Sequence, residues 1–125
     1  MIVTDKDGTV YMYRGDSGEL VFKGLDESKS CTVCLAIQDK DRNLVGQELK
    51  VNVVNSDTVT FILTPDFTDL FVVPKNKQFA IYYYGVKVCD LNSQKEDTLF
   101  VNNSTYGDLN RIVVYPRKVV GDNNG

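Results

Sequence analysis

Two cysteines stand three positions apart in Cys31-Thr32-Val33-Cys34, which is the spacing used by many redox and zinc sites. Such a pair acts together when it lies in a turn or at the start of a helix. Here the pair falls inside a β-prone run, and residues three apart on a strand point to opposite faces. Cys89 is far away in sequence, and the chain has no histidine to complete a ligand set. We therefore expect three reduced, structural thiols rather than a disulfide, redox or metal site.

Two acidic loops offer oxygen atoms of the kind that calcium prefers, Asp5-Lys6-Asp7-Gly8 and Asp39-Lys40-Asp41-Arg42-Asn43. A calcium loop of the helix-flanked type needs glycine at its sixth position and glutamate at its twelfth. Neither loop has the required residue at either position when the count starts from its first aspartate. Aspartate and asparagine are also common in hairpin turns, so we expect turns here and no bound metal.

Catalytic groups are scarce in this chain. The lack of histidine removes the commonest general base. Asp66 and Asp69 flank Phe67 in a short helical segment, where helix capping accounts for them. Gly15 and Gly18 precede a strand rather than a helix, so they do not form a phosphate-binding loop. The sequence thus predicts no enzymatic activity, no catalytic residue and no cofactor.

Two short motifs have both a functional and a local interpretation. Arg14-Gly15-Asp16 is the tripeptide that integrins bind, but a glycine turn between two strands explains it without a receptor. Asn102-Asn103-Ser104-Thr105 contains two overlapping glycosylation acceptors. Because no signal peptide is recognisable, we interpret this second motif only as a polar loop.

Tyrosine is the leading aromatic residue, and three tyrosines are consecutive in Tyr82-Tyr83-Tyr84. Tyrosines that point outward from a sheet stack on sugars or anchor a protein interface. Tyrosines that point inward belong to the core, with their hydroxyl groups at its rim. We favour the core interpretation and keep the stacking platform as the alternative.

Short alternating segments separated by polar turns run from Thr9 to Tyr115, and this pattern indicates many half-buried strands. Thr64, Pro65 and Asp66 favour one short helix near Pro65–Leu70, with Thr64 as N-cap. The expected strands are Thr9–Tyr13, a segment around Leu20 and Phe22, Ser30–Gln38, segments around Leu49–Val53 and Val59–Leu63, Gln78–Asp90, Thr98–Val101 and Arg111–Tyr115.

In the long strand Gln78–Asp90, Phe79, Ile81 and Tyr83 share one parity, whereas Val86 and Val88 share the other. Gly85 lies at the change, which suggests a β-bulge there. The expected core includes Leu20, Phe22, Val33, Leu35, Val51, Val53, Val59, Phe61, Ile81 and Val114.

The 125 residues and the ordinary apolar content fit one domain over residues 1–121, with 122–125 as a flexible tail. A formal net charge of -3 with scattered basic residues argues against nucleic-acid binding. No apolar run reaches the length of a membrane span, which argues against membrane insertion. The charged N-terminal residues lack the apolar core of a signal peptide, so we expect release into the cytoplasm of the producing cell.

Three segments together resemble a known family. They are Tyr13–Leu20 with its R-G-D-[ST]-G turn, Tyr82–Val88 followed by Glu96–Leu99, and Ile112–Pro116 with Val119–Gly121. The chain resembles the immunoglobulin-like N-terminal domain of bacteriophage baseplate upper proteins and related small phage virion proteins, over roughly residues 9–121.

The resemblance implies an all-β, immunoglobulin-like antiparallel β-sandwich of about seven or eight strands with one short helix. It also implies a structural protein of the virion, made in the host cytoplasm, that contacts other virion proteins and forms a homo-oligomer in the particle. Baseplate upper proteins continue into a long helical and fibre-forming region, whereas this sequence stops at Gly125. The resemblance therefore favours a stand-alone capsid- or tail-associated protein. A receptor- or carbohydrate-binding β-sandwich is the alternative.

Overall fold

Nine strands and one short helix form the described part of this computed structural model, which covers residues 1–99 and 110–117. In chain order they are β1 (Ile2–Thr4), β2 (Val10–Tyr13), β3 (Gly18–Lys23), β4 (Ser30–Gln38), β5 (Leu49–Val54), β6 (Thr58–Leu63), α1 (Pro65–Thr68), β7 (Ala80–Asp90), β8 (Glu96–Leu99) and β9 (Asn110–Tyr115). Within those residues, no helix has the length and apolarity needed to cross a membrane.

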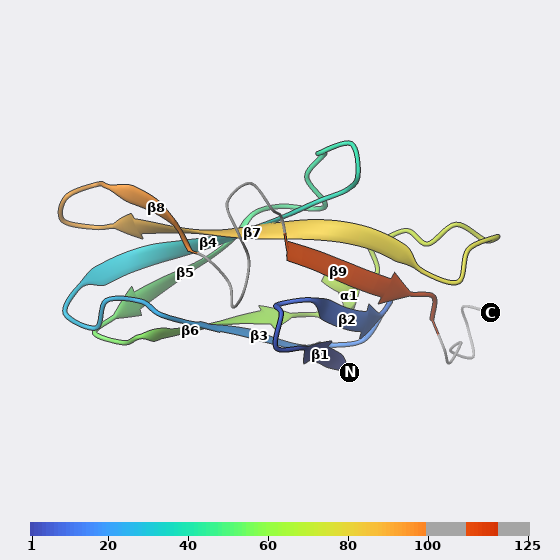
Figure 1. Cartoon of the computed structure of the whole chain (residues 1–125), viewed down its shortest axis with the longest axis horizontal. Coiled ribbons are helices and arrows are strands. Elements are labelled where there is room, and N and C mark those ends of the chain that lie inside the picture. Colours follow the sequence, from blue (N-terminus) through green and yellow to red (C-terminus); the bar gives the residue numbers. More distant parts are fainter. Residues whose placement is uncertain (100–109, 118–125) are drawn as a thin grey trace.

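The strands form two sheets that pack as a sandwich (Figure 1). The larger sheet has the order β1-β2-β9-β7-β4-β5, with β8 added to β7, and the smaller sheet pairs β3 with β6. The β2–β9 pair is parallel, and the remaining pairs are antiparallel. Phe22 of β3 connects the two layers, because its ring lies 5.8 Å from that of Tyr84 in β7, and within its own sheet it lies 6.0 Å from the ring of Phe61 in β6.

Period-two alternation produces the core as predicted. Along β4 every second side chain is buried, beginning with Cys31. The matching rows of β3 and β6 face it, and burial of each such side chain contributes about 1.5–3 kcal/mol. The buried members of the expected core are Leu20, Phe22, Val33, Leu35, Val53, Val59, Phe61 and Val114. Val51 is only half-buried, because β5 is an edge strand of its sheet.

The prediction of which residues of β7 face the core was wrong for its first part. Tyr82 and Tyr84 face the core and Ile81 lies half-buried on the other face, so Ile81 is not a core residue. The ladder between β4 and β7 runs without a break from Cys31↔Asp90 to Gln38↔Tyr83, so Gly85 forms no bulge. Burial of tyrosine is tolerated because each hydroxyl group finds a main-chain acceptor.

β8 and β9 pair with the same edge of β7, one after the other along the strand. Leu99, the last residue of β8, lies opposite Val86, and Asn110, the first residue of β9, lies opposite Tyr84. A Cβ atom added to Gly85 would meet nothing within 4 Å. Residues 100–109 therefore join two strands that would be continuous if a single residue stood opposite Gly85.

Several element boundaries differ from those expected. β1 was not predicted, and it pairs with β2 through Ile2↔Met12. The helix ends at Thr68, earlier than expected, because Asp69 begins the turn that leads to the buried Phe71. The strand expected at Thr98–Val101 is β8, and residues 100–101 lie outside the described residues. The glycosylation motif, the segment Val119–Gly121 and the expected tail also lie outside them.

Candidate interaction surfaces

The cysteines lie where the strand alternation predicted. All three are free thiols, and Cys31 is buried while Cys34, on the opposite face of β4, is half-buried. Cys89 stands opposite Thr32 on that outer face. Burial raises the pKa of Cys31, and burial followed by the nearby Glu48 carboxylate raises the pKa of Cys34. These two thiols are therefore protonated at neutral pH, which makes them poor nucleophiles and poor metal ligands.

The two acidic loops are turns stabilised by their own aspartates. The Asp5 Oδ1 atom accepts hydrogen bonds from the amides of Asp7 (2.9 Å) and Thr9 (3.0 Å). The Asp39 Oδ1 atom accepts from Asn43 (2.9 Å) and Asp41 (2.8 Å), and these bonds lower the pKa of Asp39. In residues 1–99 and 110–117 no cluster of three potential protein ligands could hold a metal ion.

The Arg14-Gly15-Asp16 turn docks against helix α1. Thr68 is fully buried, and its hydroxyl group accepts a hydrogen bond from the Gly15 amide (3.0 Å) and donates one to the Asp16 carbonyl oxygen (2.8 Å). Arg14 donates two hydrogen bonds to the carbonyl oxygen of Asp69, at 2.8 and 3.0 Å. The tripeptide thus holds the β2–β3 turn against the helix through hydrogen bonds.

A second set of contacts holds the same turn. The Arg117 guanidinium group lies 2.7 Å from the Asp69 carboxylate. It also packs over Gly15, where an added Cβ atom would lie 2.9 Å from the guanidinium carbon. Gly15 has a φ of 85°, a conformation that favours glycine. The Asp16 carboxylate pairs with the amino group of Met1, so both charged residues of the tripeptide have partners inside the molecule.

Tyr82 and Tyr84 belong to the core, as the favoured interpretation predicted, and do not form an outward platform. Tyr84 is buried and its hydroxyl group donates to the Gly8 carbonyl oxygen at 2.5 Å, while Tyr82 donates to the Val72 carbonyl oxygen at 2.7 Å. Burial raises the pKa of both phenols and keeps them protonated as donors. Tyr83 faces outward and is half-buried, and Tyr106 lies outside the described residues.

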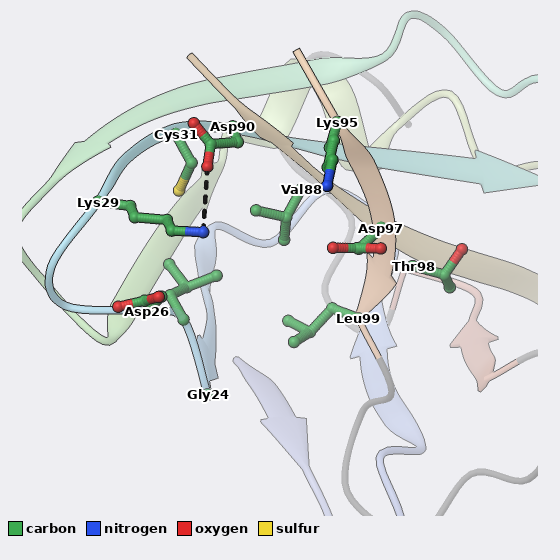
Figure 2. A pocket seen from close by; sticks show the side chains of 11 residues that line it. Gly24, Asp26, Lys29, Cys31, Val88, Asp90, Lys95, Asp97, Thr98 and Leu99 are labelled. Carbon is green, nitrogen blue, oxygen red and sulfur yellow. Dashed lines mark ion pairs between the residues drawn. The ribbon is translucent and has the colours of Figure 1, made fainter. Parts of the chain in front are cut away.

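One pocket lies at an end of the sandwich, between the β3–β4 loop and the β7–β8 hairpin (Figure 2). Val88 and Leu99 point into this space, Lys29 pairs with Asp90 at 3.3 Å across it, and Thr98 points away. The pocket has a volume of about 250 Å³, below the roughly 300–1,000 Å³ usual for ligand sites. We interpret it as the polar rim of the core.

A larger groove of about 710 Å³ opens beside the first residues of β7. Its apolar lining includes Val72 and Phe79, whose exposed fractions are 61% and 45%, together with the half-buried Ile81. The turn Asp39–Asp41 forms one charged wall, and Lys77 contributes to another. Exposed apolar side chains that line a groove with a polar rim are typical of interaction sites.

The main chain beside this groove is paired on one side only. β9 pairs with Ala80–Tyr82, but β4 ends opposite Tyr83, because the chain turns sharply after Gln38. Figure 1 shows β7 continuing past the end of β4. Among the described residues, no strand lies along the β4 side of Ala80–Tyr82. An apolar groove and an open strand edge therefore coincide.

The outer face of the β3–β6 sheet is a second apolar surface. Val21 and Ile62 are 50% and 70% exposed on it. Two short strands project an area of only about 200 Å², whereas a standard interface buries about 800 Å² on each partner. This face can contribute to an interface but is too small to form one by itself.

Comparison with known proteins gives a fold and no family. No known family and no curated protein matches the chain. Among solved structures, a periplasmic chaperone, SfaE, superposes with a TM-score of 0.60 at 12% sequence identity. The match covers 90% of this chain and 56% of the length of the chaperone chain. At this identity the likeness concerns the fold alone, and it confirms the expected immunoglobulin-like β-sandwich.

Sequence reasoning missed two features of the structure. One is the groove beside β7, and the other is the set of hydrogen bonds that joins the Arg14-Gly15-Asp16 turn to α1. The groove depends on where β4 stops relative to β7, which no local motif reports. The turn depends on Thr68, which lies more than fifty positions away in sequence. Ile81 gave a weak signal, since this large apolar residue just before the tyrosine run was assigned to the core but lies on the outer face.

Proposed function

We propose that this chain is a structural protein of a bacteriophage virion, associated with the capsid or the tail, and that it acts through protein–protein contacts. Its partners are other virion proteins and further copies of itself in the particle. The resemblance of the Tyr13–Leu20, Tyr82–Val88 and Ile112–Pro116 segments to phage virion domains supports the proposal. So does the immunoglobulin-like sandwich, which presents strand edges and apolar side chains for docking.

The observation that carries the protein-docking part of the proposal is the groove beside Ala80–Tyr82, where exposed Val72 and Phe79 lie next to an unpaired strand edge. An edge supplies main-chain hydrogen bonds to any extended partner, and pockets along it select the side chains. The carbohydrate-binding alternative is weakened, because Tyr82 and Tyr84 are turned into the core.

Gradient-purified phage particles test the virion assignment. Quantitative mass spectrometry of such particles is expected to find the chain at a constant ratio to the major capsid or tail protein. The ratio should persist after a high-salt wash, since an assembled component is held by apolar as well as ionic contacts. Absence of the chain from particles, together with its presence in the lysate, would refute the assignment.

A glycan array tests the alternative. Specific glycan binding that is lost on Tyr83→Ala, the outward member of the tyrosine run, would favour a carbohydrate-binding module. Tyr11→Ala, on another exposed strand position, provides the control. We expect no specific binding from either the native chain or the variants.

A further inference from the structure

We propose that the groove beside Ala80–Tyr82 binds an extended peptide segment of a partner protein, which joins β7 as an added strand in line with β4. The segment has three features: a basic residue where it enters, apolar residues at its centre and an acidic residue where it leaves. This inference rests on the proposed docking function and specifies the partner. Its test uses the purified chain, so its outcome is independent of whether the chain is found in virions.

The main chain of β7 is the first support. Successive residues of a strand direct their amide and carbonyl groups to alternate edges. The main-chain amide and carbonyl groups that point to the edge left unpaired by β4 are therefore either those of Ile81 or those of Ala80 and Tyr82. The register between β4 and β7 would place an added antiparallel strand opposite Tyr82, Ile81 and Ala80 in turn.

The apolar side chains of the groove are the second support. A peptide residue opposite Ile81 would share the outer face with it, whereas its neighbours would face the wall that Val72 provides. That wall is held in place, because Tyr82 donates a hydrogen bond to the Val72 carbonyl oxygen and packs 4.9 Å from Phe71. The groove is therefore formed before a peptide arrives, which reduces the entropic cost of binding.

Charge determines the direction of the peptide. The wall at the end of β4 holds two carboxylates, Asp39 and Asp41, against one ammonium group, Lys40, and Lys77 lines the groove on the approach to β7. Neither Asp41 nor Lys77 forms an ion pair with another residue of the described chain. An antiparallel peptide that continues the direction of β4 passes Asp41 first and Lys77 last. A basic residue at its start and an acidic residue at its end complement these two charges.

The probe is the synthetic hexapeptide acetyl-Lys-Val-Ile-Val-Thr-Asp-amide, titrated into the ¹⁵N-labelled chain. We expect amide chemical-shift changes concentrated in Asp39–Asp41 and in residues 72–82. Hydrogen exchange at Ala80–Tyr82 should slow when the peptide is bound. The peptide with its Lys and Asp exchanged should bind several-fold more weakly, and Lys77→Glu should abolish that preference, because both ends of the groove are then acidic.

Two N-methylated versions of the peptide distinguish strand addition from simple apolar contact. They carry methyl groups on alternate amides in opposite phases, and only one phase leaves the amides that face β7 unmodified. We expect one version to bind like the parent and the other to bind on the order of tenfold more weakly, which corresponds to about one hydrogen bond.

Matched variants locate the site. Val72→Ser should weaken binding about fivefold, and Val54→Ser, at a valine of similar exposure on β5, should leave it unchanged. Equal binding of both N-methylated peptides would overturn the proposal in favour of a side-chain groove. An absence of shifts at Ala80–Tyr82 would overturn it outright. Concentration-dependent shifts at these residues without peptide would assign the groove to a second copy of the chain, and would also overturn it.

Discussion

The two halves of β7 differ in how completely they are enclosed. From Tyr83 to Asp90 the strand lies against β4, and β8 and β9 together cover most of its other edge. From Ala80 to Tyr82 only β9 is paired with it, and the opposite edge faces the groove. One strand is thus largely paired along both edges from Tyr83 to Asp90 and along one edge only from Ala80 to Tyr82. The difference arises because β4 stops at Gln38, not from any change in the character of β7 itself.

The largest expected effect contrasts the two halves directly. Tyr84→Ala removes a fully buried ring and leaves the Gly8 carbonyl oxygen without its donor, so it should lower the free energy of unfolding by about 3–5 kcal/mol. Ile81→Ala, in the open half, should cost only about 1 kcal/mol, because Ile81 is half-buried. Urea unfolding followed by circular dichroism measures both. Equal losses would contradict the difference in enclosure.

The next effect concerns the helix that leads into the groove wall. Thr68→Val keeps the shape of the side chain but leaves the Gly15 amide and the Asp16 carbonyl group without their buried partner. It should cost about 1–3 kcal/mol of unfolding free energy. Thr60→Val, on the outer face of β6, is the control and should change stability by less than about 0.5 kcal/mol. If the two variants unfolded alike, the Thr68 hydroxyl group would not secure the turn.

A smaller effect is expected at the glycine of the same turn. Gly15→Ala combines an unfavourable positive φ with a close approach to Arg117, and should cost about 1–2 kcal/mol. Gly24→Ala has a φ of +103° but its nearest neighbour would lie 3.8 Å away, so it reports the backbone penalty alone. Thermal denaturation measures these losses. The double variant Gly15→Ala with Arg117→Ala should recover part of the extra loss of stability that Gly15→Ala shows over Gly24→Ala.

The smallest effect is a pH dependence at the enclosed end of β7. Hydrogen bonds from the Asn92 and Ser93 amides, followed by the Lys29 ammonium group, lower the pKa of Asp90. Because the folded state favours the charged carboxylate, this stabilisation is present above the ordinary aspartate pKa of about 4. It is lost as the pH falls through the lower folded value.

Asp90→Asn should therefore lower the urea midpoint at pH 7, and the gap to the native chain should shrink by pH 3. Asp97→Asn, at another carboxylate that lines the same pocket, is the control for the loss of a negative charge there. A gap for Asp90→Asn that stayed constant between the two pH values would contradict the role of its charge.

Local patterns predicted a large share of the fold. The alternation in β4 placed Cys31 and Cys34 on opposite faces, and the Thr64-Pro65 pair marked the helix start, where the Thr64 hydroxyl group accepts a hydrogen bond from the Phe67 amide at 3.2 Å. These features depend on residues within a few positions of each other, so the sequence reports them directly.

The remaining features depend on distant partners. Tyrosine fits either face of a strand, and the inward choice at Tyr82 and Tyr84 is decided by acceptors on Val72 and Gly8. β1 was missed because three residues followed by a charged loop become a strand only beside β2. The candidate groove was not foreseeable either, since it requires the relative lengths of β4 and β7.

The junction opposite Gly85 has a consequence for how such a chain can vary. Since Leu99 and Asn110 flank a single position on β7, the length of the connecting segment is decoupled from the register of the sheet. We expect that residues inserted there, whether odd or even in number, would leave the register of β8 and β9 on β7 unchanged and would not turn a core side chain toward solvent. The sandwich thus has one site at which inserted sequence, natural or engineered, can be exchanged while the hydrophobic pattern of every strand is preserved.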